Sequence, residues 1–290
     1  MKKTMKNKSA WLYPTFGSIL IGAIFPILAS ATLKSIPPFL TLTLTFITAT
    51  IVLGAILTVQ GKIWELWNKK AWKYWFLTGV LNGACFYGFY YFGLLSTTPG
   101  NAALVAQTEV FFAFLYFQAW RKESLSREHI FGILLLVVWI IYLLLPKASG
   151  WNYGDLIILI GMMFAPLGNY YQKTGRTHVS SSAFLFIRYA CTIPLTGAIS
   201  LISGEKIDTL LLQEFIWQII LMGVIVFVVK NILWVEAIKT VTVTRILALH
   251  GCMPFLTLLI IWAFQDWIPT ATQLISWIPI LIGVYFLSTK

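Results

Sequence analysis

Ten long apolar runs, separated by short polar segments, are the feature of this sequence that most constrains its fold. An α-helix needs about 20 apolar residues to cross the hydrocarbon core of a bilayer, and each run is close to that length. The runs are continuous rather than alternating, which favours helices over the strands of a closed barrel. The predicted spans are residues 11–33, 37–59, 72–95, 100–119, 129–146, 153–172, 180–203, 214–238, 242–264 and 270–288.

The composition agrees with lipid as the main solvent of the chain. Hydrophobic residues make up 59% of the sequence and charged residues only 11%, whereas about a quarter of the residues in a soluble domain are charged. A soluble fold could not cover its surface with so few charges. The sequence therefore predicts an all-α integral membrane protein with ten transmembrane helices.

The basic residues follow the topology of these spans. If the N-terminus lies in the cytoplasm, sixteen of the 21 lysines and arginines fall on the cytoplasmic side and three on the opposite side. This bias is the positive-inside pattern, and it explains the net charge of +11 without a nucleic-acid partner. We therefore expect a multi-pass protein of the cell (inner) membrane, monomeric or homodimeric, with both termini in the cytoplasm.

The three cysteines, Cys85, Cys191 and Cys252, all fall within apolar runs. None belongs to a CxxC pair, and none has a histidine at ligand spacing. We expect buried thiols, with no disulfide, no metal site and no cofactor.

The second half of the chain aligns with the first when it is shifted by 144 residues. Gly79-Val80 then meets Gly223-Val224, and the spacing of the spans matches throughout. Each half holds five spans, and because five is odd, the second half must insert upside down. The predicted repeats are residues 1–148 and 149–290. Inverted repeats are typical of secondary transporters, with the substrate site between the halves, although any ten evenly spaced helices would also align to some degree.

Several stretches resemble the EamA-type transporters of the drug/metabolite transporter (DMT) superfamily. They are residues 95–105 (LSTTPGNAALV), residues 184–189 (FLFIRY), Met253-Pro254-Phe255 and Gly132. Two places depart from the family pattern: Glu109-Val110 replaces a proline in the fourth span, and Thr45-Phe46 replaces an arginine–aromatic pair. The resemblance implies a ten-helix carrier that mostly exports metabolites such as amino acids, often coupled to protons or by exchange.

Glu109 is the clearest candidate for a functional residue, because ionisable groups at membrane depth are costly and usually functional. It lies nine residues into the fourth span, near the membrane midplane. Two interpretations are open. The carboxyl group could form structural hydrogen bonds, or, because burial favours its neutral form, it could load and release a proton.

Lys230 and its neighbour Asn231 lie midway along the eighth span. Val226, Lys230 and Trp234 are spaced at i, i+4 and i+8, so they share a helix face. The 144-residue shift relates this face to Asn82, Phe86 and Tyr90 of the third span. We expect both faces to line a central cavity; the alternative is that Lys230 extends to the membrane interface.

His250 and Arg188 each have a structural and a functional interpretation. His250 lies three residues before Met253, the counterpart of Glu109, so it either faces the same cavity or only packs. Arg188 either contacts substrate or forms a structural ion pair, for which Glu236 is the candidate partner. Gly79 and Gly83 have the spacing of a close helix contact, and we expect them to serve packing only.

These features predict an alternating-access carrier for a small polar or amphipathic metabolite. Lys230 and Glu109 offer both charge signs, which suits a zwitterion such as an amino acid or a derivative, with export favoured. The alternatives are uptake or exchange of the same class, and an intramembrane enzyme acting on lipid-linked substrates. No nucleophile motif or phosphate-binding loop supports the enzyme. A sensor without transport activity would have no central cavity.

Overall fold

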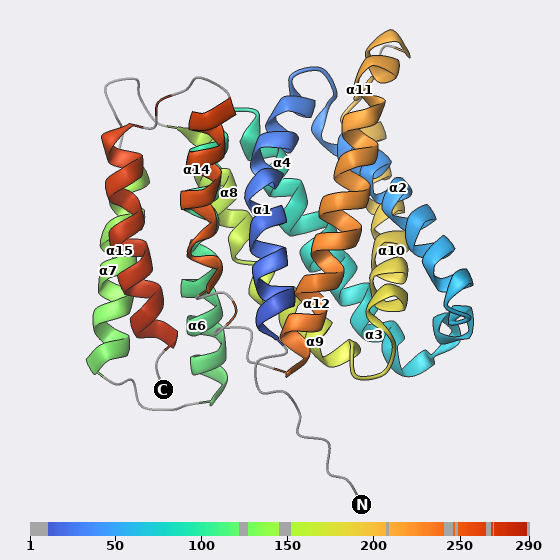
Figure 1. Ribbon diagram of the computed structural model, residues 1–290, viewed down its shortest axis with the longest axis horizontal. Coiled ribbons are helices and arrows are strands. Elements are labelled where there is room, and N and C mark those ends of the chain that lie inside the picture. The colour runs from blue at the N-terminus through green and yellow to red at the C-terminus, as the bar shows by residue number, and fades with distance from the viewer. Residues whose placement is uncertain are drawn as a thin grey trace, which may run out of the picture.

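The computed structural model describes residues 11–121, 127–144, 152–206, 209–240, 246, 249–264, 268 and 270–288. Within this part of the chain every regular element is helical, and helices occupy all ten predicted spans (Figure 1). The first half contains α1 (Leu12–Leu33), α2 (Pro38–Val59), α3 (Lys69–Thr78), η2 (Gly79–Phe86), α4 (Tyr87–Leu94), α5 (Pro99–Ala106), α6 (Thr108–Arg121) and α7 (Arg127–Leu144).

The second half repeats this order. It contains α8 (Tyr153–Met162), α9 (Ala165–Gly175), α10 (Ser181–Ile202), α11 (Thr209–Leu221), η3 (Met222–Lys230), α12 (Asn231–Thr240), α14 (Met253–Phe264) and α15 (Ala271–Ser288). Four helical stretches are long and apolar enough to cross a membrane: Leu12–Leu33, Pro38–Val59, Ser181–Ile202 and Leu212–Lys239. A short 3₁₀ helix, η1 (Ile63–Trp67), connects α2 to α3.

Prolines and hydroxyl caps set several helix starts. Pro38 and Pro99 stand in the first turns of α2 and α5, where the missing N–H of proline costs nothing. The Thr98 hydroxyl accepts a hydrogen bond from the Asn101 N–H at 3.2 Å, and Ser180 caps α10 in the same way. Such caps satisfy backbone donors that a helix start leaves free.

Two irregularities recur in both halves at the 144-residue shift. The third and eighth spans each contain a π-helical segment, η2 and η3. The fourth span is interrupted at Gln107, and the ninth span has a turn at Gly251 and Cys252. Discontinuous helices and π segments free backbone groups for other partners and are common at functional sites.

Helices of one half also pack on helices of the other half. The second span packs on the seventh (α2 on α10), and the fifth packs on the tenth (α7 on α15). The third span packs on the sixth through α4 and α8, and the equivalent contact of the other half joins α1 to η3 and α12. These contacts define two groups of helices. We name them the first core bundle (η2–α4, α5–α6, α8–α9) and the second core bundle (η3–α12, α14, α1).

Close contacts hold the first core bundle to α10. A Cβ on Gly83 would lie 2.2 Å from Thr192 Oγ1, and a Cβ on Gly79 would lie 3.2 Å from the Arg188 carbonyl oxygen. The Thr192 hydroxyl donates to the Gly79 carbonyl at 3.1 Å. The predicted close helix contact at Gly79 and Gly83 is therefore confirmed, with α10 as the partner.

Phe46 and Tyr189 stack where the two halves meet. Their ring centroids are 5.2 Å apart with an interplanar angle of 19°. Near the second span the offset of the repeat becomes 143 residues, which makes Phe46 and Tyr189 counterparts. This pair is therefore a contact of one half with the matching position of the other. The first residues of α1 and the last residues of α15 lie at the same end of the bundle, the lower end in Figure 1, as an even number of spans requires.

The cysteine expectation needs one correction. None of the three forms a disulfide, but only Cys85 and Cys191 are partly buried, and Cys252 is exposed. Cys252 lies in the turn just before α14, where the chain does not pack as a continuous helix.

Candidate substrate-binding cavity

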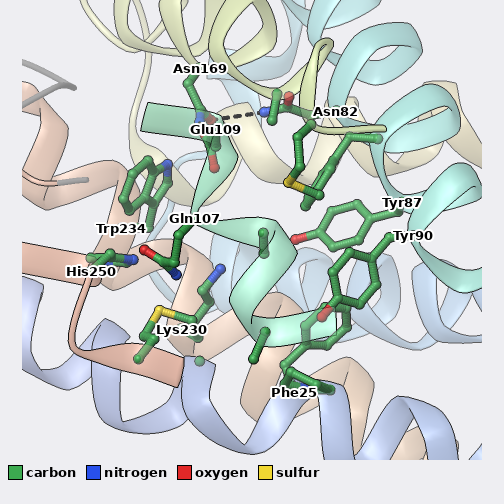
Figure 2. Close-up of a pocket in the computed structure, with 18 of the residues that line it drawn as sticks. Phe25, Asn82, Tyr87, Tyr90, Gln107, Glu109, Asn169, Lys230, Trp234 and His250 are labelled. Atoms are coloured by element: carbon green, nitrogen blue, oxygen red, sulfur yellow. Dashed lines mark hydrogen bonds between the residues drawn. The ribbon is translucent and has the colours of Figure 1, made fainter. Parts of the chain in front are cut away.

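A cavity of about 110 Å³ lies between the two core bundles. This volume suits several water molecules or a small organic molecule. All eight candidate residues from the sequence line it: Asn82, Tyr90, Glu109, Arg188, Lys230, Asn231, Trp234 and His250. Figure 2 shows most of these side chains around the same space. The structure thus brings the candidates together, although their roles with substrate stay proposals.

Glu109 is held by a chain of two amide side chains in the first core bundle. The Asn169 Nδ2 donates to Glu109 Oε1 at 2.6 Å, and the Asn82 Nδ2 donates to Asn169 Oδ1 at 2.9 Å. Figure 2 shows Asn169 placed between Glu109 and Asn82. The three residues come from the fourth, sixth and third spans. The carboxylate is therefore positioned by hydrogen bonds that connect three spans. Its own helix, α6, begins only one residue earlier, at Thr108.

A glycine makes room for this amide chain. A Cβ on Gly168 would lie only 2.1 Å from Asn82 Oδ1. Asn82 is 5% exposed, and its Oδ1 atom has no hydrogen-bond partner in the described residues. Asn82 therefore keeps one acceptor free beside a tight backbone contact.

Lys230 ends η3 and directs its side chain toward the middle of the cavity (Figure 2). This placement excludes the alternative in which Lys230 extends to the membrane interface. Its Nζ lies 3.5 Å from Asn231 Oδ1, at the limit of a hydrogen bond. No carboxylate of the described chain lies within 4.0 Å of it.

Asn231 is fixed by α10. Its Nδ2 donates to the Tyr189 hydroxyl at 2.7 Å, and that hydroxyl donates to the Phe227 carbonyl at 2.7 Å. Phe227 belongs to η3, where the π-helical turn changes the carbonyl pairing of the helix. The same turn places the consecutive residues Lys230 and Asn231 on the cavity, whereas Val226, expected on this face, is buried without lining it.

An aromatic wall closes the side of the cavity next to α4. Phe25 lies 5.1 Å from Tyr90 and 5.8 Å from Tyr87, measured between ring centroids. Phe86 packs on Tyr87 at 4.5 Å. The four rings line the cavity together, so apolar surface faces the same space as the charged groups.

His250 has both a packing and a polar contact. Its Nε2 lies 3.0 Å from the Ser18 hydroxyl, and its ring centroid lies 4.8 Å from that of Trp234. The ring is 7% exposed. His250 therefore lines the cavity as part of a satisfied cluster of the second core bundle.

Arg188 does not pair with Glu236, so that candidate ion pair was wrong. The Arg188 Nη1 donates to Gln172 Oε1 at 2.5 Å, and the guanidinium carbon lies 4.9 Å from the Tyr189 ring centroid. Glu236 instead accepts from Arg176 at 2.7 Å and from Ser181. Glu236 lies in the last turns of α12 beside the α9–α10 connection, whereas Arg188 lies two turns inside α10.

Several lining residues were not among the candidates from the sequence, above all Asn169, Gln107 and Phe25. Asn169 is an amide within the apolar sixth span, a signal that was available. Gln107 stands two residues before Glu109, at the helix break. Phe25 carries no such signal, because an aromatic residue in a span is usually packing.

Together, the ten spans, the paired irregularities and the charged cavity between two core bundles define a membrane transporter built from two repeats. The chain belongs to the EamA-like transporter family, whose model matches it twice, over residues 10–145 and 152–289. The predicted repeat boundary between residues 148 and 149 lies outside the described residues and stays a prediction.

The comparison with solved structures supports the fold. A structure described as "Crystal structure of protein" aligns with a TM-score of 0.71, covering 97% of this chain and 96% of its own. The sequence identity is 19%, so this likeness concerns the fold alone. No curated protein matches the chain.

Proposed function

We propose that this transporter moves a small polar or amphipathic metabolite through the central cavity by alternating access. The observation that supports the proposal is a cavity between two equivalent core bundles, lined by Glu109 from one and Lys230 from the other. In repeat-built carriers such bundles rock around a site near the midplane. The proposed substrate-binding residues also include Asn82, Tyr90, Asn231, Trp234, His250 and Arg188.

We propose an amino acid or an amino-acid derivative as the substrate, with export as the direction. Lys230 offers a cation for a carboxylate, Glu109 offers an acceptor for an amine, and the aromatic wall offers apolar contact for a side chain. Uptake or exchange of the same class is the alternative. Comparative metabolomics of cells and medium, with and without overexpression, distinguishes these directions by the compound that accumulates outside.

Replacement of Lys230 by alanine tests the site. We expect Lys230→Ala to lose most transport of the identified substrate in proteoliposomes, because the substrate loses its charged partner in the cavity. Lys70→Ala is the matched control, since Lys70 is exposed at the start of α3. Unchanged transport by Lys230→Ala would remove the lysine from the binding site.

The topology is also part of the proposal. We propose the cell (inner) membrane as the location, with both termini in the cytoplasm, on the basis of the basic residues. A C-terminal reporter fusion that is active only in the cytoplasm tests this orientation. A periplasmic C-terminus would contradict it.

The enzyme alternative has little support. The family to which the chain belongs consists of transporters. We therefore keep transport as the proposed function.

A further inference from the structure

Among the described residues that line the cavity, the charges do not balance. Glu109 is acidic, whereas Lys230 and Arg188 are both basic. His250 already has Ser18 as a neutral hydrogen-bond partner. With Glu109 ionised these described residues carry one excess positive charge, and with Glu109 protonated they carry two.

The other described acids are engaged elsewhere or exposed. Glu65 accepts from the Ser180 N–H, Glu205 accepts from the Phe39 and Leu40 N–H groups, and Asp155 accepts from Thr97. Glu236 pairs with Arg176, and Glu128 and Glu214 are exposed. None of these six lines the cavity, so none neutralises the excess charge there.

An uncompensated charge away from water is costly, and a bound counter-ion of opposite sign removes that cost. Arg188 is the less available of the two cations, because it is 2% exposed, donates to Gln172 and stacks on Tyr189. Lys230 has three N–H donors, and the one described contact is the long one to Asn231. Its ammonium group points into the open space (Figure 2).

We infer that the cavity selects an organic monoanion, with its carboxylate on the Lys230 ammonium and an uncharged, largely apolar body on the wall of Phe25, Tyr87 and Tyr90. One negative charge matches the excess of one that remains when Glu109 is ionised. A zwitterionic amino acid would leave that excess in place, so the substrate is a derivative without a charged amine. This inference rests on the proposed function and narrows its substrate class.

Binding measurements on matched ligands test the inference. The purified full chain receives 4-methylpentanoate, 4-methylpentanamide or leucine, which share one carbon skeleton, and 3-phenylpropanoate with its amide forms a second pair. Apparent dissociation constants come from the concentration dependence of thermal stabilisation. We expect each carboxylate to bind at least about tenfold more tightly than its amide, as a charge-assisted hydrogen bond provides. We also expect 4-methylpentanoate to bind more tightly than leucine.

Substitutions then locate the subsite. Lys230→Met should bind acid and amide equally, because the charge that distinguishes them is gone, whereas Lys230→Arg should keep the preference. Lys70→Met, which removes an exposed lysine outside the cavity, should behave as the native chain does. The comparison of ligand pairs with variants isolates the contact between Lys230 and the carboxylate.

Three results would overturn the inference: equal binding of acid and amide to the native chain, including no binding of either; tighter binding of leucine than of 4-methylpentanoate; or a preference for the acid that persists in Lys230→Met. If Lys230→Met does not fold, the native chain and Lys230→Arg still decide. Transport of a zwitterion or a cation without preference for carboxylates would refute the anion but keep the transporter. Carboxylate binding without transport in proteoliposomes would refute the transporter but keep the anion site.

Discussion

The two core bundles are built from equivalent spans of the repeat but carry different side chains at the cavity. In the first bundle, Asn82, Glu109 and Asn169 form the chain of hydrogen bonds around the carboxylate. At the matching positions of the second bundle the residues are apolar: Val226, Met253 and Phe25. Conversely, the polar residues Lys230, Asn231 and His250 of the second bundle match Phe86, Tyr87 and Ala106 of the first.

This difference shows which properties of the repeat depend on the backbone and which on single side chains. The π segments and the turns in the fourth and ninth spans recur in both halves, as expected if both bundles make equivalent movements. The charged groups occur once each, on opposite sides of the cavity. Equivalent bundles can thus enclose one asymmetric ligand.

The largest effect on transport is expected in the first core bundle, at Glu109. In a proton-coupled carrier, a pH gradient of one unit can drive an accumulation of about tenfold, since one pH unit corresponds to about 1.4 kcal/mol. We expect Glu109→Gln to abolish this pH-driven accumulation in proteoliposomes and to leave substrate exchange in place. Glu214→Gln, an exposed carboxylate of α11, is the control. An unchanged pH dependence in Glu109→Gln would remove the proton role.

The next largest effect is expected at Asn169, which forms hydrogen bonds with both Glu109 and Asn82. Asn169→Leu leaves Glu109 and Asn82 each without a partner, and unpaired buried groups cost about 1–3 kcal/mol each. We expect a clear fall in the thermal midpoint and a changed pH dependence of transport. Phe25→Leu, at the matching position of the second bundle, removes ring contacts but no hydrogen bond, so it should lower the thermal midpoint and leave the pH dependence unchanged. Equal effects of both variants on the pH dependence would contradict the asymmetry.

A smaller effect is expected at Gly168, which tests the space around Asn82. Gly168→Ala places a methyl group 2.1 Å from Asn82 Oδ1, so the amide chain must move, at a cost of about 1–3 kcal/mol. Differential scanning fluorimetry measures the loss. Gly197→Ala is the control, because its new Cβ would meet only Thr43 at an ordinary 3.7 Å. A stable Gly168→Ala variant with unaltered transport would show that the amide chain adapts freely.

The smallest effect is expected in the second core bundle, at Ser18. Ser18→Ala removes the hydroxyl that contacts His250, and a hydrogen bond of this kind contributes about 1 kcal/mol. We expect a small loss of thermal stability and little change in transport, because Ser18 does not line the cavity. A strong loss of transport would instead assign His250 a direct part in binding.

Sequence alone determined the fold class and most of the candidate site. The apolar runs predicted the ten spans because bilayer thickness sets the length of a helix that crosses it. Polar residues within those runs predicted Glu109, Lys230 and their companions, because such groups need a cavity or a partner. All of these residues line the cavity, and the repeat offset already related the fourth span to the ninth.

The tertiary structure alone decided the partners. Asn169 reaches Glu109 from 60 residues further along the chain, and Arg188 donates to Gln172 rather than pairing with Glu236. The π segments place Lys230 and Asn231 together on one wall, which regular helical spacing does not anticipate. The physical reason is that periodicity reports which face of a helix is apolar, whereas partners depend on how deep each helix sits and how it rotates against its neighbours.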